Sequence, residues 1–316
     1  MSKSIEVHLS VEMQEALTLH VAHIGKEGKG TIVFLHGFPE IWYTWRHQML
    51  AMAEAGYRAI APDCRGYGLS EQPKGEGNNK WEDLVDDLLA ILDILHIPKA
   101  FIVGKDFGAI PAYDFALSNP DRVSGVVTLG IPFSPQGFGL DLIPKGFYIW
   151  RWREPGRAEN DFGRFDVKTV IRKIYILFSG SELPIAEEGQ EIMELVETTT
   201  PLPSWFTEDD LQAYADLYEK SGFTYPLQMP YRSIDKMKNN VDPKVKAPAM
   251  LIMGEKDYCL KFPGMEDYIR GGMIKHFVPN LEVVFMPEGT HFVHEQSPGE
   301  VNKLIIDFIN NHVSEA

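Results

Sequence analysis

Apolar residues along this chain alternate between short continuous runs and longer stretches in which they recur every three or four positions. The short runs are rich in β-branched residues, which favours strands, and the longer stretches are typical of amphipathic helices. Seven runs are expected as strands: 18–25, 31–36, 58–63, 100–104, 123–130, 248–254 and 281–287. Helices are expected over 42–56 and 81–98, from residue 109 to about Leu117, and over 298–313.

The order of these elements predicts an α/β fold. Strands and helices alternate through the first 130 residues and again near the end of the chain, which favours a mostly parallel central sheet flanked by helices. Between them the strand signal fades, and helical, aromatic-rich segments broken by Pro and Gly follow. We therefore expect a core at 1–132 and 246–316, and a helical cap inserted at 133–245.

Composition narrows the class of protein. The 316 residues are 44% hydrophobic and 24% charged, as in ordinary globular proteins, and the net charge of −15 argues against nucleic-acid binding. Two cysteines, Cys64 and Cys259, do not make a disulfide framework. The first ten residues lack the apolar stretch of a signal peptide, and no run has the length of a membrane helix. We expect a cytoplasmic protein without membrane insertion.

The segment VGKDFGA, residues 103–109, joins an expected strand to an expected helix. Gly104 and Gly108 bracket Asp106 in the frame of a nucleophile elbow, where acyl-transfer hydrolases carry serine. Glycine lets strand and helix approach closely, and the side chain at the apex points to the carboxyl end of the sheet, where ligands bind. Taken alone, an acid at a helix start is more often a cap than a catalytic residue, so the other motifs must decide.

HGFP, residues 36–39, follows the expected strand at 31–36. In elbow enzymes the loop at this place and the residue after the nucleophile supply the two backbone N–H groups of an oxyanion hole. The expected donors are Phe38 and Phe107.

An acid and a histidine stand at two later strand ends. Asp257 follows the strand at 248–254, and His291 follows the strand at 281–287. The order nucleophile, acid, histidine is the order that elbow enzymes use, which predicts that Asp106, Asp257 and His291 act together. Glu255 is a rival for the acid, and His294 is a rival for the histidine.

These motifs together resemble a known family. They are HGFPE (36–40), PDCRGYGLSEQP (62–73), GKDFGA (104–109), GEKD (254–257) and GTHFVHEQSP (289–298). The set resembles the soluble epoxide hydrolases of the α/β-hydrolase superfamily, plant-type enzymes above all, over nearly the full chain. The resemblance implies the α/β-hydrolase fold, with the cap inserted after the sixth strand of that fold, which corresponds to the fifth expected strand listed above, 123–130. It also implies an apolar epoxide and water as substrates, with no metal or organic cofactor. A monomer or a homodimer is expected, and the sequence does not distinguish the two.

The resemblance also implies two tyrosines in the cap that hydrogen-bond the epoxide oxygen. Tyr148 stands before an EPG sequence, as in the family, and Tyr231 stands in the Tyr–Arg pair near the end of the cap. The segment around Tyr231 is one residue longer than the usual pattern, which makes Tyr225 a rival. The pocket is expected to be aromatic, with substrate contacts from Phe38, Phe107, Trp150 and Trp152.

An aspartate nucleophile suits attack on saturated carbon, because a carboxylate is ionised at neutral pH and needs no base. The ester that forms keeps a carbonyl, which water can then attack. His291, oriented by Asp257, is expected to activate that water, and Glu40 to position it.

Two alternatives remain open. A haloalkane dehalogenase uses the same aspartate but needs side-chain N–H donors for halide, which neither Phe38 nor Phe107 offers. A small-molecule receptor on the same fold would not need the whole set of catalytic residues. The chain also departs from the family pattern, with Lys105 where histidine is common and Phe107 where tryptophan is common. Asp63 and Arg65 are expected to brace loops.

Overall fold

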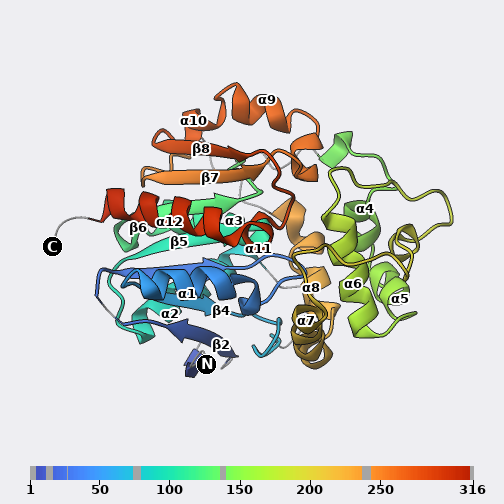
Figure 1. Cartoon of the computed structure of the whole chain (residues 1–316), viewed down its shortest axis with the longest axis horizontal. Helices are drawn as coiled ribbons and strands as arrows, with labels where there is room; N and C mark the ends of the chain where they lie inside the picture. The colour runs from blue at the N-terminus through green and yellow to red at the C-terminus, as the bar shows by residue number, and fades with distance from the viewer. Residues whose placement is uncertain are drawn as a thin grey trace.

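The computed structural model describes residues 5–11, 17–26, 28–73, 80–135, 140–236 and 243–313. Its centre is an eight-stranded sheet in the order β1-β2-β4-β3-β5-β6-β7-β8 (Figure 1). The pairs β1–β2 and β2–β4 are antiparallel, and all other neighbours are parallel. The strands are β1 (Ile5–Val11), β2 (Leu17–Ile24), β3 (Thr31–Leu35), β4 (Arg58–Pro62), β5 (Ala100–Lys105), β6 (Val123–Leu129), β7 (Ala249–Gly254) and β8 (Leu281–Met286). The mostly parallel sheet predicted from the sequence is confirmed.

All seven expected strands are present, and β1 is an additional one that the sequence analysis missed. It pairs with β2 from Ile5 opposite His23 to Val11 opposite Leu17. Its sequence, IEVHLSV, alternates apolar and polar residues, which is the signal of a half-buried antiparallel strand and was sufficient to predict it.

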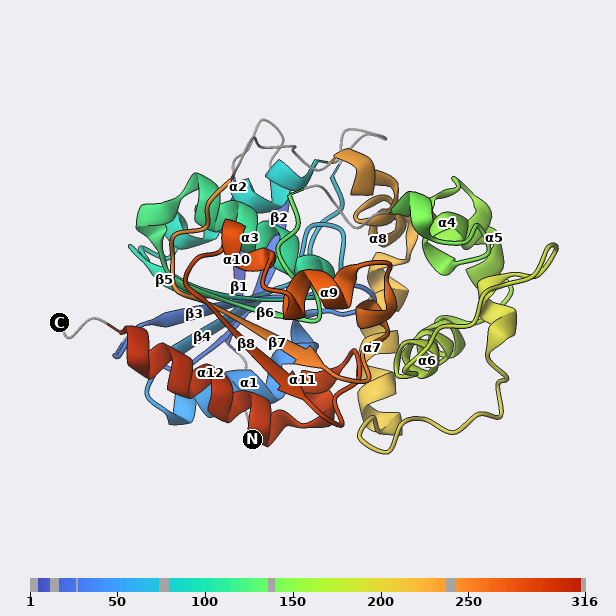
Figure 2. The same cartoon turned by 90° about the horizontal axis from the view of Figure 1, so that it is seen from above.

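Helices cover both faces of the sheet. In Figures 1 and 2, α1 and α12 lie on one face, and α2 and α3 lie on the other. The expected helix at 42–56 begins as a 3-10 turn, η1 (Trp42–Trp45), before α1 starts. The helices of the core are α1 (Arg46–Glu54), α2 (Trp81–Ile94), α3 (Ala109–Ser118), α9 (Met265–Arg270), α10 (Ile274–Phe277), α11 (Val293–Gln296) and α12 (Pro298–His312).

The two faces of the sheet bury separate apolar clusters. On one face Phe34 of β3 packs against Trp45, and the same cluster takes in Ile305 and Phe308 of α12. On the other face Val33 joins the buried residues of α2 and α3. A sheet covered on both faces needs strands that are apolar at every position, which explains the continuous runs in the sequence.

Between β6 and β7 the described residues form helices and no strand. They are α4 (Tyr148–Arg153), α5 (Arg157–Phe162), α6 (Val167–Phe178), α7 (Glu208–Ser221) and α8 (Thr224–Gln228), with 3-10 turns η4 (Leu140–Leu142), η5 (Ile192–Leu195) and η6 (Tyr231–Lys236). We call residues 140–236 the cap segment. It lies beside one end of the sheet, on the right in Figures 1 and 2. The expected domain boundaries, 133 and 245, stay predictions.

Within the described ranges, none of the helices combines the length and the apolar character that crossing a membrane requires.

Candidate active site

Asp106 occupies a strained turn between β5 and α3. It begins the 3-10 turn η2 (Asp106–Gly108) and has φ of +52°, which non-glycine residues rarely adopt. Both bracketing glycines are required. A Cβ on Gly104 would lie 2.4 Å from the Gly108 carbonyl oxygen, and one on Gly108 would lie 2.3 Å from the Leu35 carbonyl oxygen. The local sequence therefore presents a carboxylate at the end of β5, as expected.

The Asp106 carboxylate has a partner on each oxygen. The Phe38 backbone N–H donates to Oδ1 at 3.1 Å, and His291 Nε2 lies 3.2 Å from Oδ2. Burial alone would raise the pKa of Asp106, but the hydrogen bond with His291 and the Lys105 charge bring that pKa below its ordinary value, helped by the Phe107 backbone N–H. The carboxylate is therefore ionised and nearly buried, at 4% exposure.

His291 joins Asp106 to Asp257. Its Nδ1 lies 3.0 and 3.1 Å from the two Asp257 oxygens, and the Asp257 Oδ1 also accepts the Cys259 N–H at 2.9 Å. Burial and Lys105 disfavour a charged imidazole, but the Asp257 charge and the Asp106 hydrogen bond raise the His291 pKa well above its usual range. The structure thus brings together the three residues that the sequence placed at three strand ends.

The two rivals lie elsewhere. Glu255 pairs with Arg270 at 2.5 Å on the surface. His294 is buried 2.7 Å from Thr44 Oγ1 and 3.5 Å from Glu40. Neither is beside Asp106.

Tyr148 and Tyr231 are buried next to each other, close enough to Asp106 to be affected by its charge. Their ring centroids are 6.0 Å apart, and Trp152 lies edge-on to both, at 5.0 and 5.1 Å. The Phe38 and Phe107 rings each lie 5.3 Å from the Tyr231 ring. Burial raises the pKa of both phenols well above 10, and the Asp106 charge adds to the effect. Both tyrosines therefore keep their protons at neutral pH.

Trp150 is not part of this group. Tyr148 and Trp152 share a face of α4 because they are four residues apart, whereas Trp150 is two residues from each. Its indole N–H donates to the Ile143 carbonyl at 3.0 Å, and the Arg153 guanidinium lies 4.9 Å over its ring. The substrate contact expected of Trp150 stays a prediction without geometric support.

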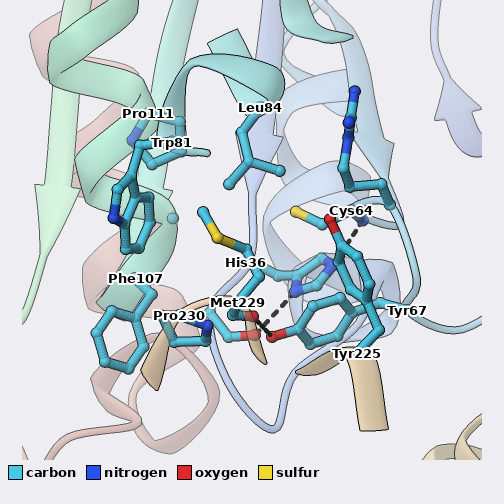
Figure 3. A pocket seen from close by; sticks show the side chains of 13 residues that line it. His36, Cys64, Tyr67, Trp81, Leu84, Phe107, Pro111, Tyr225, Met229 and Pro230 are labelled. Atoms are coloured by element: carbon cyan, nitrogen blue, oxygen red, sulfur yellow. Dashed lines mark hydrogen bonds between the residues drawn. The ribbon is translucent and has the colours of Figure 1, made fainter. Parts of the chain in front are cut away.

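Tyr225, the rival of Tyr231, lines a separate narrow cavity of about 20 Å³. Figure 3 shows this cavity with Trp81 and Phe107 on one side and Tyr225 beside Cys64 on the other. The space is enough for about one water molecule. The Phe107 ring therefore lies between the two tyrosines, because it contacts Tyr231 and also lines the cavity beside Tyr225.

Lys105 and Glu40 form a buried ion pair behind the elbow, with Lys105 Nζ 3.9 Å from Glu40 Oε1. Both side chains are inaccessible, and Nζ has no hydrogen-bond partner among the described residues. The Gly37 N–H donates to Glu40 Oε2 at 2.8 Å. Burial raises the Glu40 pKa to about 6, against the opposing effect of the Lys105 charge.

Sequence reasoning missed Glu295, a buried glutamate near Glu40. Arg46 donates to Glu295 at 2.5 Å, and the hydroxyls of Tyr175 and Tyr214 donate to it at 3.2 Å. It also missed Tyr258, whose hydroxyl lies 3.2 Å from that of Tyr148. Tyr258 directly follows Asp257 at the end of β7, so its position beside the expected acid was the available signal.

Asp63 and Arg65 brace loops. Asp63 accepts the Trp42 N–H at 2.9 Å and lies 2.9 Å from His20 Nδ1. Arg65 donates to both Asp87 oxygens, at 2.6 and 2.7 Å.

Two triplets of described residues hold potential metal ligands within 4.8 Å of one another: Asp257, Cys259 and His291, and Glu40, His294 and Glu295. Hydrogen bonds explain why the members of each triplet lie close together. The first contains the Asp257–His291 pair, and Thr44 bonds to all three members of the second.

Comparison with known proteins gives the family. The α/β hydrolase fold family matches residues 30–298. The chain is 39% identical over 301 residues to epoxide hydrolase 1 of Siraitia grosvenorii, covering 91% of this chain and 94% of that protein. The structure of a Vigna radiata epoxide hydrolase mutant matches with a TM-score of 0.89 at 33% identity, over 98% of this chain and 100% of that chain. The structure of potato (Solanum tuberosum) epoxide hydrolase I matches with a TM-score of 0.85 at 34% identity, over 97% of this chain and 100% of that chain. These relatives confirm the resemblance seen in the motifs, and the chain belongs to the plant-type epoxide hydrolases of the α/β-hydrolase superfamily.

Proposed function

We propose that this protein hydrolyses an apolar epoxide to a vicinal diol in two steps, through an ester between the substrate and Asp106. One observation carries the proposal. A buried, ionised carboxylate stands at a strained turn, between a backbone N–H on one oxygen and an imidazole on the other. Family membership supports the same activity.

In the first step Asp106 attacks one carbon of the epoxide. Oδ1 is held by the Phe38 N–H, which leaves Oδ2 as the attacking oxygen and makes Oδ1 the carbonyl oxygen of the ester. The carbon–oxygen bond of the ring breaks, and the departing oxygen takes a proton from Tyr148 or Tyr231. A phenol suits this role, because an alkoxide is far more basic than a phenolate.

In the second step water attacks the ester carbonyl. His291 carries a proton while the Asp106 charge lies beside it. Ester formation removes that charge, so the His291 pKa falls and the imidazolium returns its proton, through solvent, to the phenolate left by ring opening. The neutral imidazole can then act as a base and take a proton from the attacking water. The Phe38 and Phe107 N–H groups stabilise the oxyanion, each by about 3–4 kcal/mol in comparable sites. The intermediate collapses by breaking the bond to the diol oxygen, which takes back the proton that His291 removed from water. Asp106 is left as a carboxylic acid that carries one oxygen from water, and its proton passes to His291, which restores the resting ion pair.

Glu40 and Lys105 are buried beside the elbow, and the Asp106 charge adds to the effect of burial in raising the Glu40 pKa. Glu40 is held by the Gly37 N–H and by Thr44, at 2.8 and 3.2 Å. We propose that Glu40 orients the attacking water and that Lys105 keeps Glu40 ionised.

The surroundings of Asp106 favour an apolar epoxide over a haloalkane as the substrate. Phe38, Phe107 and Trp152 pack around the two phenols. Two phenol donors match one developing alkoxide, whereas Phe38 and Phe107 offer no side-chain donor for a halide. The expected oligomeric state, a monomer or a homodimer, stays a prediction.

A substitution at His291 tests the two-step scheme. His291→Phe should form the ester but fail to hydrolyse it, because no base remains for the water. Intact-protein mass spectrometry after incubation with styrene oxide should show an adduct of one substrate mass on this variant. The matched control His291→Phe/Asp106→Asn should show none. The proposal is wrong if the single variant stays unmodified.

A further inference from the structure

Tyr258 places a third phenol at the site. It begins the 3-10 turn η7 (Tyr258–Lys261), directly after Asp257. Its side chain is buried, and its hydroxyl oxygen lies 3.2 Å from the hydroxyl oxygen of Tyr148. Nothing in the two-step scheme above uses this contact.

The fold fixes the position of Tyr258 from three directions. Asp257 caps η7 by accepting the Cys259 N–H at 2.9 Å, which sets the backbone at residue 258. The Tyr258 ring lies 4.8 Å from the His291 ring and 5.4 Å from the Phe178 ring of α6. The contact between the two hydroxyls therefore joins η7 of the core to α4 of the cap segment.

The chemistry of ring opening decides the direction of this hydrogen bond. Each phenol has one proton, because burial raises the pKa of both well above 10. If Tyr148 donated to Tyr258, it would have no proton directed at the epoxide oxygen. The productive arrangement therefore has Tyr258 as the donor and Tyr148 as the acceptor.

We propose that Tyr258 is a positioning residue for ring opening, whose hydroxyl donates to the Tyr148 oxygen and leaves the Tyr148 proton free for the epoxide. This inference rests on the proposed function. When Tyr148 gives its proton to the alkoxide, its oxygen becomes negative in an apolar, aromatic site. The hydrogen bond from Tyr258 then becomes charge-assisted and stabilises that phenolate more strongly than it stabilised the neutral phenol.

The test is Tyr258→Phe, which removes the hydroxyl and keeps the ring. Single-turnover reactions with styrene oxide and enzyme in excess separate the rate constant for ester formation from that for ester hydrolysis. We expect ester formation at saturating enzyme to slow by about 10-fold or more, the usual effect of losing a hydrogen bond to a charged group. The apparent dissociation constant for the epoxide and the hydrolysis rate should stay within about two-fold, because neither depends on the Tyr148 charge.

Two comparisons distinguish positioning from packing. In a Tyr148→Phe background the same substitution should have no further effect on ester formation, because the group it acts through is gone. Tyr113→Phe, which removes a buried hydroxyl bonded to Thr128 at 2.8 Å, should leave both rate constants unchanged.

The outcomes separate this inference from the proposed function. Wild-type protein that forms no ester refutes the proposed function and this inference with it. Wild-type protein that forms the ester at the same rate as Tyr258→Phe overturns only the role of Tyr258. An equal slowing of both steps, or an undiminished effect in the Tyr148→Phe background, also overturns that role.

Discussion

Asp106 and His291 form a pair whose charges depend on each other. Their facing atoms are 3.2 Å apart, and each shifts the pKa of the other toward the ionised form. The resting site thus holds an imidazolium between two carboxylates. When Asp106 becomes an ester, its contribution to the His291 pKa is lost, and Asp257 is the main group that still favours the charged imidazole. The nucleophile therefore controls whether the base is available.

This coupling predicts different pH dependences for the two steps. The Asp106 pKa is lowered, so ester formation should be nearly constant from pH 5 to 8. Ester hydrolysis needs neutral His291, so its rate constant should rise about tenfold per pH unit below the imidazole pKa of the ester form and level off above it. Rapid-quench mass spectrometry should show the ester accumulating at low pH. Ester formation that slows with acid while hydrolysis stays constant would contradict the coupling.

Lys105 is the clearest departure from the family pattern at residue scale, and the structure gives it a partner in Glu40. Glu40 and Glu295 are both buried, and each raises the cost of ionising the other. Arg46 lies beside Glu295, which leaves Lys105 as the cation beside Glu40. Removing one partner of a buried pair is far more destabilising than the pair itself is stabilising.

Lys105→Met should therefore destabilise the protein in a pH-dependent manner. The folded-state pKa of Glu40 is about 6, above its ordinary 4.5, so stability already falls as pH rises through this range. Loss of the Lys105 charge raises that pKa further and extends the fall to higher pH. Urea unfolding should show a deficit of about 3 kcal/mol at pH 8 and clearly less at pH 5.

The control is Lys303→Met, which removes an exposed lysine paired with Asp307 on α12. It should change stability little at either pH, because exposed pairs contribute little. A Lys105→Met deficit of equal size at pH 5 and pH 8 would show that packing is lost and that Glu40 does not respond to the charge.

At the scale of elements, the turn between β5 and α3 depends on close backbone contacts. Gly108 lies against the carbonyls of Leu35 and His36, which belong to β3 and the loop that follows it. The same loop supplies the Phe38 N–H. The two glycines thus bring the nucleophile and its hydrogen-bond donor to one place.

Gly108→Ala should separate these segments. The new methyl carbon would lie 2.3 and 2.6 Å from two backbone oxygens. This steric clash cannot be relieved without moving a strand. We expect a loss of about 3 kcal/mol in unfolding free energy, together with loss of activity. Gly299→Ala, in the first turn of α12 with open space around it, is the matched control and should be neutral or up to about 1 kcal/mol stabilising. Equal effects at both positions would contradict the account of the turn.

The elements also show how far the sequence could predict the structure. Apolar runs and strand ends were sufficient to place Asp106, Asp257 and His291 at one edge of the sheet. They could not predict the contact of Tyr258 with Tyr148, because that contact joins segments 110 residues apart and depends on how the cap segment sits on the core. The position of Trp150 away from the Tyr148–Trp152 face of α4 follows from helix phase, which the sequence alone could have indicated.

At the scale of the whole molecule, the proposed function divides the chemistry between the cap segment and the core. The nucleophile, base and acid come from loops at the ends of β5, β8 and β7, and both phenols come from the cap segment. Under the proposed function, ring opening and product release therefore need both parts. The burial of the site between them also keeps the ionised groups away from bulk water, where their mutual effects would be weaker.

The central claim is that Asp106 forms a covalent ester, and one turnover in ¹⁸O-labelled water tests it most directly. With enzyme in excess, the diol should contain unlabelled oxygen at both carbons, and one ¹⁸O atom should appear in the peptide that contains Asp106. Label in the diol of the first turnover, with none in that peptide, would mean that water attacks the epoxide directly and would contradict the account.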